Sequence, residues 1–379
     1  HDEIKRRGLL QTDQLVGNAL IDMYAKHGLF IQAREVFNEI PIQSVIAWTT
    51  LISGYVDHGQ AEEALECFEE MKLMNVSPNA FTFVCILKAC ASTRAIEKGR
   101  EIHIEIDRRG LLQSDIYIGN ALVDMYVKFG FLTQAQKVFD SLIVHDVVSW
   151  TALIGGYVEH GFSEEALSCF EKMQLDRVSP NLITFICGLK ACTSIGAIEK
   201  GREIHIHIKK NGFETDIVVG NTLVNMYARC GSLTQAREVF KKLLIKDTVA
   251  WTALIAGYAQ IGESRNVFSI FESMVGEGIL PNVITFVNIL NACRHTVSFD
   301  KGKSYFDLMS ENYGILPNRE LYTCLIDLYG RIGQLDNAVA MVEKLPFWSH
   351  IAMWQTIMHS CRKWGNEELG RQTFHNALC

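Results

Sequence analysis

The sequence predicts an all-α fold, a superhelical solenoid of about ten stacked helix-turn-helix repeats. Two observations carry this prediction: internal repetition over long distances, and apolar residues spaced at the period of an α-helix within each repeated segment. Trp48, Trp150 and Trp251 recur at intervals of 102 and 101 residues, and each is followed by Thr, then Leu-Ile, then Gly-Tyr. Such an interval is too long for one helical repeat, so shorter repeats must lie within it.

The interval divides into three repeats, which have 31, 35 and 36 residues in the first round. A shorter tenth repeat is expected at 319–350, and the tail 351–379 begins another. Residues 1–13 are expected to be the end of a repeat whose beginning is missing, because His1 lies 102 residues before His103. The three rounds cover 14–44, 45–79 and 80–115, then 116–146, 147–181 and 182–216, then 217–247, 248–282 and 283–318.

Each repeat is predicted to form two helices. In 45–79, one amphipathic face is formed at i, i+3, i+4 and i+7, a glycine then ends the helix, and a second apolar stripe follows. A helical pair of this length cannot bury both of its faces alone, so neighbouring pairs must stack. The residues are Trp48, Leu51, Ile52 and Tyr55 for the first stripe, Gly59 for the stop, and Ala64, Leu65, Phe68 and Met71 for the second stripe.

Composition limits the functional classes. No run of 18 apolar residues is present, so no membrane span is expected, and 11 cysteines without a CxxC pair favour a reducing compartment over a disulfide framework. His103-Ile104-Glu105 matches half of a zinc deaminase signature, but the Pro-Cys-x-x-Cys half is absent. We find no phosphate loop, nucleophile elbow or acidic metal cluster. The chain is therefore expected to be no enzyme, with no metal, cofactor or small-molecule substrate.

Two helical-repeat families have repeats of about this length. The tetratricopeptide pattern comes close in 45–79, 147–181 and 248–282, but its Gly and Pro are displaced by two positions. The cycling repeat lengths instead resemble the PLS subclass of the plant pentatricopeptide-repeat family, whose short (S), standard (P) and long (L) motifs alternate. The resemblance rests on Asn120–Tyr126 (S), Trp150–Tyr157 (P), Leu189–Cys192 with Gly201–His205 (L), Tyr322–Arg331 (closing S) and Trp354–Gly370 (E extension).

This resemblance implies a right-handed superhelix with a defined domain order. Residues 1–13 would end a truncated L-type repeat, and 14–318 would form three S-P-L triplets. Residues 319–350 would be the closing S-type repeat, and 351–379 the start of an E-type extension.

The resemblance also implies binding of single-stranded RNA with about one base per repeat, selected by the fifth and last residues of each repeat. These positions hold small polar side chains that can reach a base edge. Helix capping or turn formation is the alternative explanation for such residues. The pairs are Asn18 with Ser44, Thr49 with Asn79, Asn120 with Asp146, Thr151 with Asn181, Asn221 with Asp247, Thr252 with Asn282, and Thr323 with His350.

By the family's code, Thr with Asn resembles an adenine reader, Asn with Asp a uracil reader, and Asn with Ser a cytosine reader. The preference of Thr323 with His350 stays open. L-type repeats have an aliphatic fifth residue that cannot make a directional hydrogen bond, so they are expected to space the RNA: Val84 with Asp115, Ile186 with Asp216, and Val287 with Asn318. The expected target is 5′-CANUANUANN.

Two further positions are implied to contact RNA. The second residue of each repeat would sandwich the bases, although packing between repeats would also explain an apolar residue there. A basic thirteenth residue would contact phosphate, although a solvated helix end also favours lysine and arginine. The second residues are Leu15, Ile46, Phe81, Tyr117, Val148, Ile183, Val218, Val249 and Ile284, with Glu320 breaking the pattern; the thirteenth are Lys26, Lys128, Arg229 and Arg331.

Because a basic thirteenth residue recurs only about every three repeats, few phosphate contacts are expected. The net charge of −7 would weaken non-specific binding, so base contacts would dominate. Proteins of this subclass typically direct C-to-U editing in the mitochondrion or chloroplast. A deaminase domain would then lie beyond residue 379 or act in trans, with editing accessory proteins as further partners. A splicing or RNA-stability factor of the same family, or a tetratricopeptide-like scaffold that binds protein, remains open.

Overall fold

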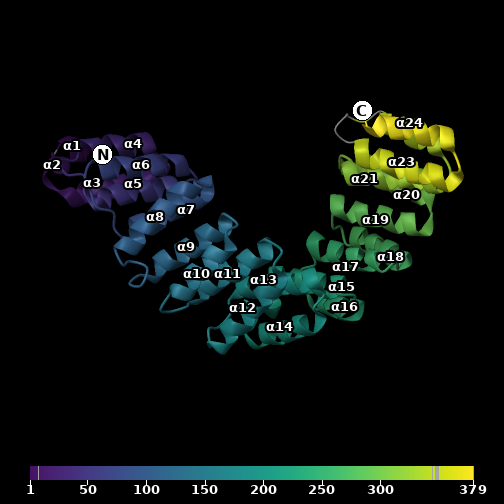
Figure 1. The fold of residues 1–379 in the computed structure, drawn as a ribbon, viewed down its shortest axis with the longest axis horizontal. Coiled ribbons are helices and arrows are strands. Elements are labelled where there is room, and N and C mark those ends of the chain that lie inside the picture. Colours follow the sequence, from purple (N-terminus) through teal and green to yellow (C-terminus); the bar gives the residue numbers. More distant parts are fainter. Residues whose placement is uncertain (7, 344, 346–349, 379) are drawn as a thin grey trace. The chain divides into compact units, whose positions relative to one another are not determined.

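The computed structural model describes residues 1–6, 8–343, 345 and 350–378, with side chains described for all of these except 2, 350 and 378. All regular secondary structure in these ranges is helical, and nearly all of it falls into pairs (Figure 1). The all-α prediction is therefore confirmed. The short N-terminal helices are α1 (Asp2–Arg6) and α2 (Leu9–Thr12).

Ten helix pairs follow, and an eleventh region closes the described chain as α23 (His350–Trp364) with α24 (Glu367–Leu378). The first four pairs are α3 (Gln14–Lys26) with α4 (Phe30–Glu39), α5 (Val45–Asp57) with α6 (Ala61–Leu73), α7 (Ala80–Thr93) with α8 (Ile96–Arg108), and α9 (Ile116–Lys128) with α10 (Leu132–Ser141).

The next pairs are α11 (Val147–Glu159) with α12 (Ser163–Leu175), α13 (Leu182–Ile195) with α14 (Ile198–Lys210), α15 (Ile217–Arg229) with α16 (Leu233–Lys242), and α17 (Thr248–Gln260) with α18 (Ser264–Gly276). The last two are α19 (Val283–Thr296) with α20 (Phe299–Tyr313), and α21 (Arg319–Arg331) with α22 (Leu335–Glu343). A 3₁₀ turn, η1 (Phe213–Thr215), precedes α15. The grouping of these pairs into S, P and L types stays a prediction.

Polar caps and glycine turns fix where the helices begin and end. The side chain of Asp146 accepts hydrogen bonds from the backbone N–H groups of Val148 and Ser149, which have no partner inside the helix. Gly59 has φ 75°, a conformation that glycine adopts without steric cost, and it turns the chain from α5 into α6. The sequence thus encodes each helix pair locally.

The core lies between paired helices and between successive pairs. Trp48, which is almost fully buried, packs edge-on against Phe37 with ring centroids 4.5 Å apart, and Trp150 packs on Phe139 at 4.6 Å in the next round. The chain forms two compact halves, His1–Ala191 and Cys192–Cys379. Within the N-terminal half, α3, α5, α7, α9 and α11 pack successively side by side, as do α15, α17, α19, α21 and α23 in the C-terminal half. We call each series a first-helix row.

A histidine–tyrosine hydrogen bond recurs where one round meets the next. His103 Nδ1 lies 2.8 Å from the hydroxyl of Tyr126, and the equivalent ring of His205 lies 2.9 Å from that of Tyr227. His1 makes the same contact with Tyr24 at 2.9 Å. His1 therefore occupies the place in its round that His103 occupies in the next.

Candidate nucleic-acid interface

In two of the three S-type repeats of the predicted triplets, the fifth and last residues meet directly. The Nδ2 group of Asn120 lies 3.2 Å from both carboxylate oxygens of Asp146, and Asn221 Nδ2 lies 3.0 and 2.9 Å from those of Asp247. Both asparagines are only 8% exposed. The structure thus joins the two predicted selecting positions into one polar group.

Helix geometry explains this meeting. Each aspartate is the N-cap of the following first helix, so its carboxylate is held at that helix end by backbone N–H groups. A carboxylate can only accept, so the asparagine must present its NH₂ to it, which directs the amide oxygen away. The Oδ1 atoms of Asn120 and Asn221 are buried and have no hydrogen-bond partner. Each S-type pair therefore keeps one unused acceptor.

The first S-type pair differs. Ser44 caps α5 by accepting from the N–H of Ala47 at 3.4 Å, and no hydrogen bond joins Ser44 to Asn18. The Oδ1 atom of Asn18 is again buried without a partner. The structure therefore does not join this pair as it joins the other two.

In the predicted P-type repeats, a third residue bridges the pair. Thr49 Oγ1 lies 2.7 Å from Thr82 Oγ1, which in turn donates to Asn79 Oδ1 at 2.9 Å. The same arrangement joins Thr151 to Asn181 through Thr184, and Thr252 to Asn282 through Thr285.

The sequence-based prediction missed these bridging threonines, all of which are fully buried. Asn79 and Asn282 form capping boxes with Thr82 and Thr285, each asparagine accepting from the threonine N–H while the threonine hydroxyl accepts from the asparagine N–H. The signal was present as Asn-x-x-Thr, which recurs in every round at the start of the third repeat.

The remaining last residues also serve as caps. Asp115 accepts from the N–H of Tyr117 at 2.8 Å, and Asn318 from that of Leu321 at 3.1 Å. Capping, the alternative explanation for these polar residues, is therefore confirmed; it places their side chains without deciding whether they also select bases. In the tenth repeat, the Thr323 hydroxyl donates to the Arg319 carbonyl at 2.8 Å, and the side chain of His350 lies outside the described residues.

The nine second-position side chains all point into solvent. Their exposed fractions run from 53% at Val148 to 76% at Leu15. Packing between repeats would bury these groups, so the structure argues against that alternative. The other members of this exposed series are Ile46, Phe81, Tyr117, Ile183, Val218, Val249 and Ile284.

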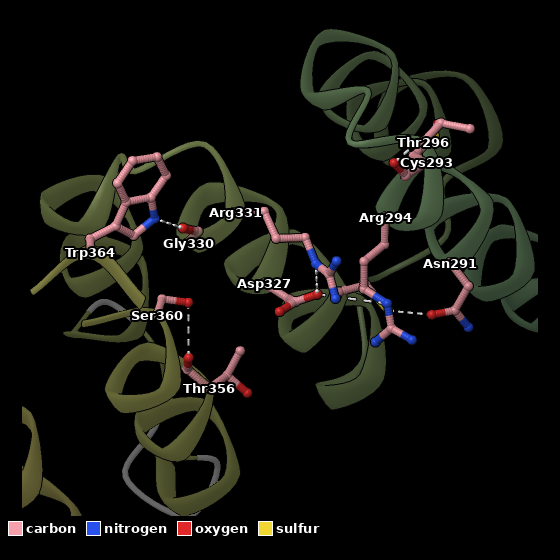
Figure 2. A network of polar contacts seen from close by, with 11 residues as sticks. Asn291, Cys293, Arg294, Thr296, Asp327, Gly330, Arg331, Thr356, Ser360 and Trp364 are labelled. Carbon is pink, nitrogen blue, oxygen red and sulfur yellow. Dashed lines mark hydrogen bonds and ion pairs between the residues drawn. The ribbon is translucent and has the colours of Figure 1, made fainter. Parts of the chain in front are cut away.

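Three of the four thirteenth-position basic residues already have a carboxylate partner one helical turn earlier. Lys26 Nζ lies 2.7 Å from Asp22, and Lys128 Nζ lies 2.8 Å from Asp124. Figure 2 shows Arg331 reaching Asp327, with Nε 2.7 Å from Oδ2. The fourth, Arg229, is exposed. Asn225 lies one helical turn before it, at the position where the other three have an aspartate.

The histidine of the partial deaminase match and the buried cysteines have structural roles. The ring of His103 bonds Tyr126, and burial lowers its pKa from 6.5. Burial raises the pKa of the Cys90 and Cys192 thiols to about 12, which disfavours the reactive thiolate. Over the described ranges, no three His, Cys, Asp or Glu side chains are placed to hold a metal ion. None of the described helices is both long and apolar enough to cross a membrane.

Comparison with known proteins identifies the repeats. A model of the PPR repeat family matches residues 43–92, 145–194 and 246–295, and a PPR repeat model matches 18–42, 120–147, 221–247 and 320–346. The chain belongs to the pentatricopeptide-repeat family. The matched segments include the tryptophan series that first revealed the repetition.

Relatives and solved structures agree with this membership. A pentatricopeptide repeat-containing protein of Arabidopsis thaliana is 37% identical over 98% of this chain and 62% of its own length. The chloroplastic protein CRR2 of Arabidopsis thaliana is 36% identical over 95% and 56%, and a mitochondrial one is 36% identical over 91% and 54%. The chain thus spans about three fifths or less of the length of these relatives.

The crystal structure of the pentatricopeptide repeat protein PPR10 in complex with an 18-nt psaJ RNA element superposes with a TM-score of 0.77. It is 16% identical, and the match covers 96% of this chain and 55% of PPR10. This likeness shows a common fold, that of a helical-repeat solenoid.

Proposed function

We propose that this chain binds single-stranded RNA in a sequence-specific manner, with about one base for each repeat. The observation that carries the proposal is the joining of fifth and last residues into polar groups beside exposed apolar side chains. Family membership supports it, and so does the RNA in the PPR10 crystal structure. Bases would lie between successive second-position side chains, with their edges toward the polar groups.

The S-type pairs have the chemistry of a uracil reader. With the NH₂ of Asn120 held by Asp146 and its Oδ1 buried, the acceptors left for a base are the lone pairs of the Asp146 carboxylate. Uracil carries an N–H donor at N3, whereas cytosine has a lone pair there that two acceptors would repel. This donor–acceptor match favours uracil over cytosine at nucleotides 4 and 7 of the proposed target, and the family's code selects uracil over guanine, which also carries an N–H donor.

The P-type groups offer a different pattern. Because Thr82 gives its hydroxyl hydrogen to Asn79, Thr49 must donate to Thr82 and keeps lone pairs to accept. The Nδ2 group of Asn79 makes no hydrogen bond in the structure, so it can donate. One acceptor beside one donor fits the amino group and ring nitrogen of adenine or cytosine, and the family's code selects adenine.

The proposed target is therefore 5′-CANUANUANN, with the L-type and tenth repeats unassigned. The test is fluorescence anisotropy of this labelled RNA, compared at physiological salt with an RNA in which each A and U is exchanged. Clearly weaker binding of the exchanged RNA is expected, and equal affinity would refute base selection. A sharper test pairs Thr151→Asn with Asn181→Asp, which should move the preference at nucleotide 5 from A to U.

We further propose that the chain belongs to the PLS subclass and directs C-to-U editing of a mitochondrial or chloroplast transcript, without being an enzyme itself. The names of the mitochondrial and chloroplastic relatives support an organellar location. A deaminase, covalently attached or recruited in trans with accessory proteins, would act just 3′ of the bound RNA. Loss of the gene should then abolish editing beside this element; altered splicing or transcript stability alone would favour the other family roles.

A further inference from the structure

The first helices of the first two rounds differ in charge from those of the third round. In α3, α5, α7, α9, α11 and α13, all charged residues are four carboxylates and four lysines, so this series is neutral. In α15, α17 and α19, the only charged side chains at neutral pH are two arginines, Arg229 and Arg294. The eight residues of the neutral series are Asp22, Asp57, Asp124 and Glu159 with Lys26, Lys88, Lys128 and Lys190.

Replacement of acidic residues, rather than addition of basic ones, creates the difference. Asn225 stands where Asp22 and Asp124 bind their lysines, and Gln260 stands where the preceding rounds have Asp57 and Glu159. Among the described residues, no carboxylate lies within salt-bridge distance of Arg229. Its positive charge is therefore locally uncompensated.

Two other arginines, one in α19 and one in α21, share a single carboxylate. Arg294 Nε lies 3.6 Å from Asp327 Oδ2, the same oxygen that Arg331 contacts at 2.7 Å (Figure 2). The carboxylate can compensate only one of the two charges. The capping residues Asp216 and Asp247 do not offset the excess. Asp216 lies a helix length, about 20 Å, from Arg229. Asp247 contacts Asn221, which is eight residues or about 12 Å before Arg229, so both distances exceed the screening length of about 8–10 Å.

Arg229 also lies on the same face of α15 as the proposed base-selecting residue Asn221. Asn221, Asn225 and Arg229 follow one another at intervals of four, so they occupy one face of α15. A phosphate at Arg229 would thus lie on the same helix face as the base at Asn221. The first two rounds have this geometry as well, but there Lys26 and Lys128 must first separate from Asp22 and Asp124.

We infer that the RNA backbone is anchored mainly by the third round of repeats, at a phosphate contact made by the uncompensated Arg229, while Asp22 and Asp124 mask the equivalent lysines of the first two rounds. This inference rests on the proposed RNA binding and adds to it a location for the electrostatic part of the affinity. The ligand is the phosphate of any single-stranded nucleic acid backbone, independent of base.

The test measures how the dissociation constant of labelled 5′-CANUANUANN depends on KCl concentration for the 379-residue chain and three variants. Each phosphate contact with a single strand contributes about 0.7 to the slope of log K against log salt. Arg229→Gln should lower the slope by about 0.7. Lys128→Gln, the matched change in the preceding round, should lower it far less. Asn225→Asp, which restores the masking carboxylate, should lower it as Arg229→Gln does.

Equal slopes for Arg229→Gln and Lys128→Gln, or an unchanged slope for Asn225→Asp, would overturn the inference. Circular dichroism of each variant verifies that the helices are intact. The exchanged-base RNA separates the two proposals. If base exchange leaves affinity unchanged while Arg229→Gln still lowers the slope, the anchor is supported and base selection fails. If base exchange weakens binding but the variants share one slope, base selection is supported and the anchor fails.

Discussion

Replacement of Thr184 by valine tests whether the buried threonine bridge sets base preference. Thr184 is fully buried, and its hydroxyl contacts Thr151 Oγ1 at 2.7 Å and Asn181 Oδ1 at 2.9 Å. Valine keeps the shape but removes the oxygen. The hydroxyl of Thr151 then loses its acceptor and turns freely, so it can donate to a base as well as accept from one.

The magnitude follows from the bonds that are lost. A buried donor left without a partner costs about 1–3 kcal/mol, so we expect the free energy of unfolding to fall by that amount. One discriminating hydrogen bond contributes about 1 kcal/mol, so selectivity for A over U at nucleotide 5 should fall about fivefold. Selectivity at nucleotides 2 and 8 should not change, because Thr82 and Thr285 bridge those pairs independently.

The assay is fluorescence anisotropy with RNAs that carry U in place of A at nucleotide 2, 5 or 8, together with urea unfolding followed by circular dichroism. Thr184→Ser is the control, since it keeps the hydroxyl and should keep the discrimination. Unchanged selectivity at nucleotide 5 in Thr184→Val would refute the reasoning, and so would an equal loss at all three nucleotides.

Three further changes address stacking, packing and pH. Ile183→Ala should weaken RNA binding while leaving the urea midpoint nearly unchanged, because Ile183 is 58% exposed; a stability loss above about 1 kcal/mol would instead indicate packing. Gly330→Ala should destabilise the chain, because a Cβ there would clash with Ser360 Oγ, and adding Ser360→Gly should restore part of the lost thermal stability, since a glycine inside α23 itself costs about 0.5–1 kcal/mol. Burial lowers the pKa of His103 from 6.5, so the unfolded chain takes up a proton first as pH falls. Stability should therefore be full above pH 6.5 and decrease below it, and His103→Gln should weaken that decrease in urea titrations at pH 7.5 and 5.

The fold was predictable because its signals are local and repeated. Trp48, Leu51, Ile52 and Tyr55 mark a helix face that the structure shows buried against its neighbours, and Gly59 ends that helix with a positive φ as expected. Repetition over three rounds removes the ambiguity that one amphipathic segment would leave. The all-helical solenoid therefore followed from the sequence alone.

The sequence indicated candidate residues for the site but not the hydrogen bonds that connect them. Resemblance indicated Thr49 and Asn79, yet only the structure shows that Thr82 joins them. The Asn-x-x-Thr pattern predicts a capping box, but it does not show that the threonine also contacts Thr49. The thirteenth-position residues were expected to be equivalent. Whether Lys128 or Arg229 has a carboxylate partner depends on the residue one helical turn earlier, Asp124 or Asn225. The structure shows that these residues lie on the same helix face as the basic side chain.

The capping and base-selecting interpretations of the last residue in each repeat are compatible, and their combination has a physical advantage. An N-cap is held by backbone N–H groups whose positions the next helix fixes, so Asp146 and Asn181 have little rotational freedom before RNA arrives. A preorganised group loses less entropy on binding than a free surface side chain would. Asn and Asp both cap well, so exchanging one for the other alters the donors and acceptors shown to a base while the helix end is preserved. Specificity can thus change repeat by repeat without loss of the fold.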